Sequence, residues 1–172
     1  ALVLPGGEST TMRKTSELNG LLSAIFNLVD GRPSLPILGT CAGAIIMCES
    51  KNGRSALIDV ELDRNAYGGQ IESFQADLEV VNLDNGKIIS QVTDSKQARW
   101  NNRGLPVGKL LADSKKSFPG IFIRAPRFTH VNDGVNIVAR CGDETVGVVM
   151  GTRMALAFHP ELTTDYRFHR WL

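Results

Sequence analysis

The segment Gly39-Thr40-Cys41-Ala42-Gly43 carries one cysteine between small residues, after one apolar run and before another. A strand, a nucleophile and a helix in this order form a nucleophile elbow, in which small neighbours permit the sharp turn that exposes the side chain. The N-terminus of the following helix favours the thiolate, which is the form of cysteine that attacks a substrate. A buried cysteine that only fills space beside a sheet is the alternative interpretation, and this segment alone leaves both open.

The segment His159-Pro160-Glu161 supplies the two other groups that a cysteine nucleophile needs. An imidazole accepts the thiol proton and returns it to the leaving group. A carboxylate orients that imidazole and stabilises its charged form. In an extended segment, positions i and i+2 point to the same side, and Pro160 stiffens the link between them. A single histidine near a chain end is usually a surface residue, but a cysteine elbow and a His-x-Glu segment together favour a catalytic site.

The segment Pro5-Gly6-Gly7-Glu8-Ser9 follows a short apolar run. Two glycines after a strand allow backbone N–H groups to face a ligand, as an oxyanion hole requires. Taken alone, the segment is better explained as an ordinary glycine-rich turn.

The first half of the chain must position these groups, and in it short apolar runs alternate with helical stretches. This alternation is typical of an α/β domain with a largely parallel sheet, and such folds collect their active sites at strand ends. The elements predicted here are a strand at 2–4, a helix from Ser9 or Thr10, a helix over 18–29, a strand over 36–40 and a helix over 42–49.

The middle of the chain, over 58–92, favours strands that pair antiparallel, and the end of the chain carries further strand-like runs. Residues 82–119 are mostly polar and predict a long surface insertion. His159 follows the last apolar run, and a final helix is expected from Thr164. The predicted strands cover 58–62, 71–74, 76–81, 87–92, 120–124, 135–141, 145–150 and 154–158.

The composition is that of one soluble domain. The 172 residues, 42% of them hydrophobic, suffice for a core. The 19 basic and 18 acidic residues leave a net charge of +1, which gives no reason to expect nucleic acid or an anionic membrane as a partner. No apolar run is long enough to span a membrane. The cysteines number 3 and lack a CxxC pair, which predicts reduced thiols in a cytoplasmic compartment and no metal site.

Five segments match one known family in the family's order and over nearly the whole chain. Through them the chain resembles the glutaminase-subunit family of pyridoxal 5′-phosphate synthase, within the class I glutamine amidotransferases. The cysteine and the His-x-Glu segment indicate only the wider class, and the other segments narrow it to this family. The matching segments are 4–12, 39–43, 64–74, 122–126 and 157–163.

The resemblance implies a fold and a set of site residues. The fold is the three-layer α/β class I glutamine amidotransferase fold, with a central, mostly parallel sheet and helices on both faces. The implied catalytic triad is Cys41, His159 and Glu161. The implied oxyanion hole uses Gly7 and Ala42. The residues implied to bind glutamine are Gly7, Glu8, Ser9, Arg64, Ile123 and Arg124.

The resemblance also implies a reaction and a partner. A cysteine thioester intermediate converts L-glutamine to L-glutamate, and the ammonia passes to a synthase subunit that makes pyridoxal 5′-phosphate, the active form of vitamin B6. The glutaminase itself is expected to need no metal or cofactor and to work in a cytoplasmic hetero-oligomer. Members of the family normally carry a further strand and helix before Leu2, so residues 1–172 predict a single domain with an incomplete N-terminal segment and an incomplete C-terminal helix.

Three other interpretations stay open. The first is a glutaminase domain that serves another amidotransferase complex, which would use the same triad. The second is a cysteine hydrolase of a related α/β class, against which the segments around Arg64 and Arg124 count. The third is a non-catalytic interaction subunit, against which the presence of Cys41, His159 and Glu161 counts.

Overall fold

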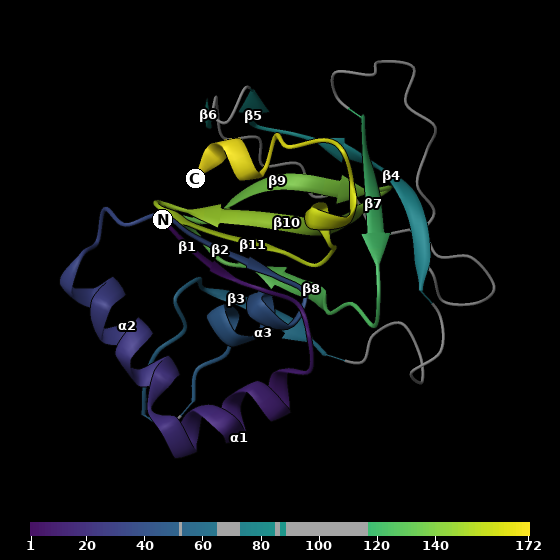
Figure 1. Cartoon of the computed structure of the whole chain (residues 1–172). Coiled ribbons are helices and arrows are strands. Elements are labelled where there is room, and N and C mark those ends of the chain that lie inside the picture. Colours follow the sequence, from purple (N-terminus) through teal and green to yellow (C-terminus); the bar gives the residue numbers. More distant parts are fainter. Residues whose placement is uncertain (52, 65–72, 85–86, 89–116) are drawn as a thin grey trace.

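A computed structural model describes residues 1–51, 53–64, 73–84, 87–88 and 117–172, which form an α/β fold around a seven-stranded sheet (Figure 1). The strand order is β1-β2-β11-β10-β9-β4-β7, and β3 pairs with β8 and β5 with β6 in two small ribbons. The helices are α1 (Ser9–Asn19), α2 (Leu21–Gly31) and α3 (Ala42–Cys48), with 3₁₀ helices η1 (Pro160–Leu162) and η2 (His169–Trp171). The strands are β1 (Leu2–Leu4), β2 (Ile37–Thr40), β3 (Val60–Asp63), β4 (Phe74–Val80), β5 (Leu83–Asp84), β6 (Lys87–Ile88), β7 (Ser117–Phe122), β8 (Arg127–Val131), β9 (Asn136–Cys141), β10 (Glu144–Met150) and β11 (Arg153–Leu156).

The predicted α/β class is confirmed, and the parallel part of the sheet consists of β1, β2 and β11. Leu2 lies opposite Ile37, and Ile37 lies opposite Arg153 on its other side. Parallel neighbours need a crossover, and α1 and α2 provide it between β1 and β2. The ends of these three strands carry the glycine-rich turn, Cys41 and the segment that leads to His159.

The remaining pairings of this sheet, from β11 through β10, β9 and β4 to β7, are antiparallel. The parallel pairing that the sequence predicts for most of the sheet is therefore confined to one side. The reason is local, because Gly142 (φ 59°) and Gly151 (φ 58°) form tight turns between successive strands. A strand that reverses through so short a turn must lie antiparallel to the one before it.

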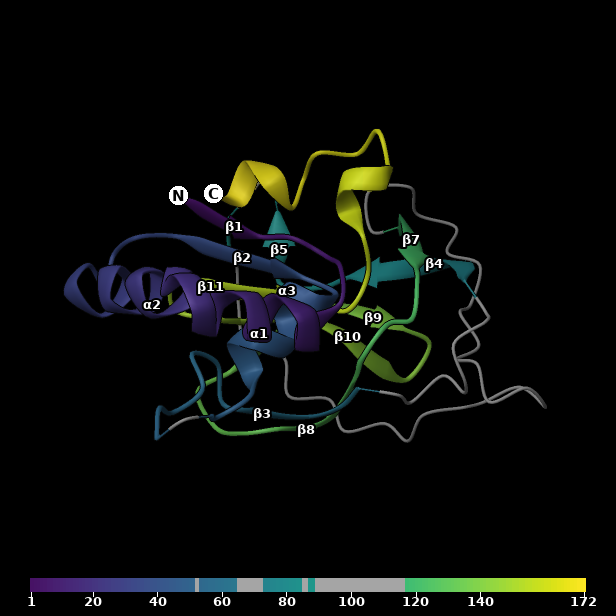
Figure 2. The same cartoon turned by 60° about the horizontal axis from the view of Figure 1, so that its bottom comes forward.

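The three α-helices lie on one side of the sheet, and the C-terminal segment with η1 and η2 lies on the other (Figures 1 and 2). Every residue of α3 is buried, which fits a helix built only of apolar and small residues. On the opposite side, the aromatic rings of Phe118, Phe158 and Phe168 pack against one another at centroid distances of 4.9–5.5 Å. Helix α3 on one side of the sheet and this aromatic cluster on the other are therefore both packed as core.

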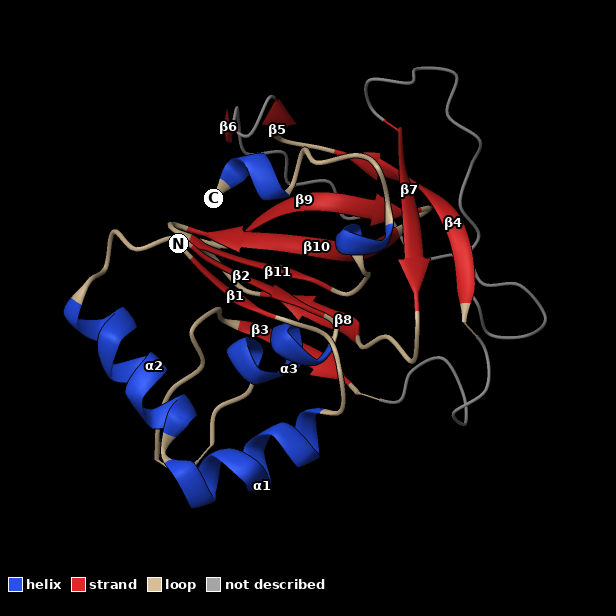
Figure 3. Cartoon of the chain, in the orientation of Figure 1, coloured by secondary structure: helices blue, strands red, loops and turns tan. Residues whose placement is uncertain are grey.

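The structure corrects the prediction of a final helix from Thr164, because only the short 3₁₀ helix η2 forms there (Figure 3). The Asp165 carboxylate accepts a hydrogen bond from the Arg167 N–H at 3.0 Å, and the Thr163 hydroxyl accepts one from the Asp165 N–H at 3.2 Å. Such side-chain bonds offer the backbone an alternative to the helix.

Two other differences concern strands. The strands predicted over 71–74 and 76–81 are replaced in the described residues by the single strand β4, and 71–72 lie outside them. Strand β8 was not predicted and pairs with β3. Most of the expected insertion at 82–119 lies outside the described residues.

No helix that the described residues form is long and apolar enough to cross a membrane.

Candidate active site

Cys41 occupies the turn between β2 and α3 in a strained backbone conformation, with φ 49° and ψ −107°. Positive φ is uncommon for a residue with a side chain and persists only where the surroundings enforce it. Here the Cys41 N–H donates to the Leu156 carbonyl of the neighbouring strand at 2.8 Å, and the Cys41 carbonyl accepts the first helical bond from the Ile45 N–H at 3.2 Å. The turn therefore has the geometry of the predicted elbow.

Two glycines let α3 approach the sheet closely at this turn. A Cβ atom on Gly43 would lie 1.9 Å from the Leu4 carbonyl oxygen of β1. A Cβ atom on Gly39 would lie 2.6 Å from the Met47 sulfur and 2.8 Å from the Gly43 carbonyl carbon. The small residues that the sequence shows around Cys41 are thus required by packing.

His159 is fixed through both its backbone and its ring. Its N–H donates to the Ile121 carbonyl at 2.8 Å, and its Nδ1 lies 2.8 Å from Oε1 of Glu161. The predicted contact of His159 with Glu161 is therefore present. The link between them is not extended as expected, because Pro160 and Glu161 belong to η1.

The environment of His159 favours its charged form. Interaction with Cys41 is the largest cause that raises the pKa of His159 to about 9, the hydrogen bond to Glu161 is the second, and burial opposes both. Burial has the largest single effect on the pKa of Glu161 and would raise it. The hydrogen bond with His159, a backbone hydrogen bond and nearby charges together hold that pKa below the ordinary value. The buried Nε2 of His159 has no hydrogen-bond partner among the described residues.

The end of β7 forms a wall of this site. The Cys41 sulfur lies 3.5 Å from the Ile123 carbonyl oxygen, two residues after the carbonyl that holds His159. Arg124 follows in a left-handed conformation with φ 47°, and its side chain is exposed. The structure thus brings the predicted Ile123 to the sulfur and places Arg124 at the adjoining surface.

The glycine-rich turn between β1 and α1 lies against the imidazole. A Cβ atom on Gly6 would come within 2.4 Å of Cε1 of His159, so only glycine fits there without movement. Gly7, the next residue, has φ 148° and directly precedes Glu8. The glycine-rich turn and Cys41 are therefore both neighbours of the His159 side chain.

Glu8 has a role that the sequence analysis missed. It is the N-cap of α1, and its carboxylate accepts hydrogen bonds from the N–H of Thr10 at 3.0 Å, the N–H of Thr11 at 2.6 Å and the Thr11 hydroxyl at 2.6 Å. The Thr11 hydroxyl is the main cause that lowers the pKa of Glu8 to about 2. The neighbouring Ser9, also predicted to bind glutamine, is buried.

Arg64 forms an ion pair that the sequence analysis also missed. Its Nε and Nη2 donate to the two carboxylate oxygens of Glu49, and Nη2 of Arg13 lies 3.3 Å from the same Glu49 Oε2. The hydrogen bonds to Glu49 are the main cause that raises the pKa of Arg64, and the charge of Glu8 acts in the same direction. Two of the predicted glutamine-binding residues, Glu8 and Arg64, therefore lie within electrostatic range of each other.

The two other cysteines lack the features of Cys41. Burial raises the pKa of Cys48 far above the ordinary value and that of Cys141 to about 12. Both thiols are buried. Neither can compete with Cys41 as a nucleophile, because attack requires the thiolate.

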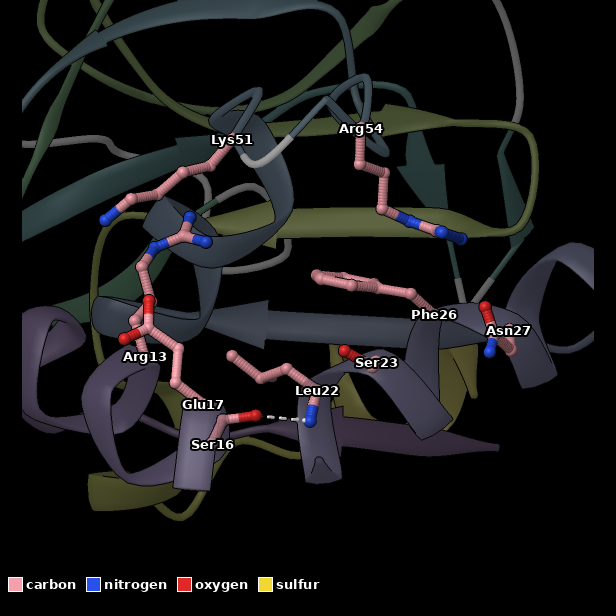
Figure 4. A pocket seen from close by; sticks show the side chains of 9 residues that line it. All are labelled: Arg13, Ser16, Glu17, Leu22, Ser23, Phe26, Asn27, Lys51 and Arg54. Atoms are coloured by element: carbon pink, nitrogen blue, oxygen red, sulfur yellow. Dashed lines mark hydrogen bonds between the residues drawn. The ribbon is translucent and has the colours of Figure 1, made fainter. Parts of the chain in front are cut away.

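A groove of about 210 Å³ lies apart from this site, between α1, α2 and the turn that carries Arg54 (Figure 4). Both of its arginines are compensated, since Arg54 pairs with Asp30 and lies over the Phe26 ring, while Arg13 pairs with Glu49. None of the predicted catalytic or glutamine-binding residues lines it.

Within the described residues no group of three or more His, Cys, Asp or Glu side chains could hold a metal ion.

Comparison with known proteins gives consistent matches. The model of the SNO glutamine amidotransferase family matches residues 1–93 and 91–172. Pyridoxal 5′-phosphate synthase subunit PdxT of Thermococcus onnurineus is 39% identical over 99% of this chain and 74% of its own length. The same subunit of a strain of Thermus thermophilus is 38% identical over 99% of this chain and 75% of its own length. A crystal structure of a glutamine amidotransferase superimposes with a TM-score of 0.69 at 37% identity, covering 98% of this chain and 75% of that one.

Proposed function

The chain belongs to the SNO glutamine amidotransferase family, and from that membership we propose that Cys41, His159 and Glu161 form its catalytic triad. Its PdxT relatives are subunits of pyridoxal 5′-phosphate synthase. The chain is accordingly the glutaminase subunit that hydrolyses glutamine for pyridoxal 5′-phosphate synthesis. The observation that supports the triad is the bond from His159 Nδ1 to Glu161, which leaves Nε2 for the Cys41 sulfur.

In the proposed mechanism the Cys41 thiolate attacks the side-chain amide carbon of glutamine. The N–H groups of Gly7 and Ala42 stabilise the oxyanion of the tetrahedral intermediate. The Ala42 N–H is available because the first-turn N–H groups of a helix have no intrahelical acceptor. His159 donates its proton to the amide nitrogen as the carbon–nitrogen bond breaks, so that ammonia leaves and a glutamyl thioester remains. His159 then takes a proton from water, and the resulting attack on the thioester releases glutamate and the Cys41 thiolate.

The proposed glutamine pocket uses groups of both charges. The substrate carries an α-carboxylate and an α-ammonium, which a guanidinium and a carboxylate bind well. Arg64 and Arg124 offer guanidinium groups for the α-carboxylate, and Glu8 offers a carboxylate for the α-ammonium. The three hydrogen bonds that Glu8 accepts leave room for an ammonium, because a carboxylate has about four lone-pair sites. Gly7, Ser9 and Ile123 complete the proposed pocket.

The partner is a synthase subunit, as the name of the PdxT relatives states. We propose that the described residues are one amidotransferase domain, that it assembles with this synthase in a cytoplasmic hetero-oligomer acting as a lyase, and that ammonia passes directly between the two active sites. Neither nucleic acid nor a membrane enters this proposal.

Addition of the synthase subunit is expected to raise kcat for glutamine hydrolysis more than it changes KM. Contact with the partner would arrange oxyanion donors that act only on the transition state, and such interactions appear in kcat. The measurement is glutamate release from glutamine with and without the synthase. An unchanged kcat would contradict this coupling, and no hydrolysis even in the complex would contradict the proposed activity.

The variant Glu161→Gln is expected to shift the alkaline limb of the kcat/KM profile to lower pH. The pKa of His159 is raised from 6.5 to about 9 by Cys41 and then by Glu161, so its proton is retained below about pH 9 and is lost as the pH rises through that value. Removal of the Glu161 charge takes away one of these two causes. The pKa of His159, and with it the pH at which His159 loses its proton, therefore falls toward 6.5. Asp30→Asn, which changes a distant surface carboxylate, should leave the limb in place. An equal profile for Glu161→Gln and wild type would count against the assignment.

A further inference from the structure

We propose that Glu49 is a positioning residue that orients the Arg64 guanidinium to receive the α-carboxylate of glutamine. This inference rests on the proposed function, because it takes Arg64 as a glutamine-binding residue. Glu49 directly follows α3, and Cys41 directly precedes the same helix. One short helix thus carries the nucleophile at its first end and the anchor for Arg64 at its other end.

The contact between Arg64 and Glu49 uses one side of the guanidinium. Nε of Arg64 donates to Oε1 of Glu49, and Nη2 donates to Oε2. A guanidinium has five N–H donors in a rigid plane, so this contact occupies two and leaves three on the Nη1 and Nη2 end. Among the described residues no other acceptor takes those donors. That end can form a second, bidentate contact with a carboxylate.

Arg13 also holds Glu49, through the same oxygen that Nη2 of Arg64 contacts. The Arg13 side chain is buried, and its Nη2 lies 3.3 Å from Oε2 of Glu49 and 3.4 Å from the Ile46 carbonyl oxygen. Arg13 belongs to α1, the helix that Glu8 caps. The cluster of Arg13, Glu49 and Arg64 therefore connects α3, α1 and the residue that follows β3. The proposed nucleophile and two of the three charged residues of the proposed pocket, Glu8 and Arg64, belong to these elements or cap them.

The charge of this cluster fits an anionic ligand. Two guanidinium groups share one carboxylate, which leaves a net charge of +1 within the cluster. The Glu8 carboxylate also acts on Arg64, so the two proposed glutamine-binding charges lie near each other, as the α-ammonium and α-carboxylate of one substrate require. The Arg64 side chain is 32% exposed and that of Arg13 is 8% exposed, so a ligand can reach only Arg64.

The test is the kinetics of glutamine hydrolysis by Glu49→Gln in the complex with the synthase. The loss of one charge-assisted hydrogen bond predicts a KM about tenfold higher with little change in kcat, because Arg64 binds a part of the substrate that does not react. Glu49→Asp keeps the charge but is too short for the bidentate contact, so it should raise KM as well even if Glu49→Gln folds poorly. Asp30→Asn removes the carboxylate partner of Arg54 at the surface and should leave KM unchanged.

A second arm separates this inference from the proposed function. Arg64→Met should raise KM at least as much, and adding Glu49→Gln to it should cause no further rise, because Glu49 acts through Arg64. Iodoacetamide, which lacks the amino acid group, should alkylate Cys41 equally in wild type and Glu49→Gln, whereas 6-diazo-5-oxo-L-norleucine should react more slowly with the variant. Additive effects of the two substitutions, or a normal KM in Glu49→Gln and Glu49→Asp, would overturn the role of Glu49. A normal KM in Arg64→Met would overturn it too, and would remove Arg64 from the proposed pocket while leaving the triad intact.

Discussion

Replacement of Cys41 by alanine is expected to lower kcat for glutamine hydrolysis by about 10⁴-fold or more, since members of a catalytic triad act as a unit. The proposed reaction needs a covalent thioester, and alanine offers no atom to form it. The remaining cysteines cannot substitute, because burial raises the pKa of both Cys48 and Cys141 and keeps them as thiols. The measurement is glutamate release in the presence of the synthase subunit.

Cys48→Ala is the matched control for this substitution. Cys48 lies on the same helix and is also buried, but it belongs to the core rather than to the site. Its replacement should leave kcat close to the wild-type value, with at most a modest loss of stability from the small cavity. Glutaminase activity that survived in Cys41→Ala, or that was lost equally in Cys48→Ala, would show that the elbow cysteine is not the nucleophile.

The proposed catalytic residues could be predicted from the sequence because their signals are local. A strand, a cysteine between small residues and a helix occur within a few positions, and the structure places Cys41 at the expected sharp turn, with a positive φ. His159 and Glu161 are two positions apart, so almost any turn between them allows contact. The backbone between them was predicted as extended and is a 3₁₀ turn, because Pro160 at the first position of a helical turn is as favourable as Pro160 in a strand.

The ion cluster around Glu49 could not be predicted in the same way. Arg13 and Glu49 are 36 positions apart, and Glu49 and Arg64 are 15 apart, so their contact depends on how α1 and β3 pack against α3. In the sequence each is a single charged residue, and such residues are usually exposed. Only the folded chain shows that one carboxylate links both guanidinium groups.

The direction of the strands was predictable only in part. An apolar run shows that a strand is buried, but it carries no information on its neighbour's direction. That direction follows from the connections, which are helices before β2 and tight turns at Gly142 and Gly151. The glycines were visible in the sequence, and weighing them as hairpin turns would have indicated the antiparallel part of the sheet.

Gly43→Ala is expected to destabilise the fold by about 3 kcal/mol or more, which is the upper range for overpacking. The added Cβ atom would lie 1.9 Å from the Leu4 carbonyl oxygen and 2.6 Å from the Leu4 carbonyl carbon. Both are backbone atoms of β1, and β1 is fixed by its pairing with β2 at Leu4 and Gly39. Neither side can yield as a flexible side chain would, so α3 must move away from the sheet. The measurement is the free energy of unfolding from denaturant titration.

Gly31→Ala is the matched control, because no atom lies within 4 Å of the position that its Cβ would occupy. Gly31 ends α2, where alanine is the better helix former, so this variant should be as stable as wild type or slightly more so. The displacement of α3 in Gly43→Ala would also move Cys41 away from His159, and glutaminase activity should therefore fall even below the unfolding transition. A Gly43→Ala variant that was both stable and fully active would mean that the elbow does not depend on the close contact of α3 with β1, and the packing argument for its small residues would then be wrong.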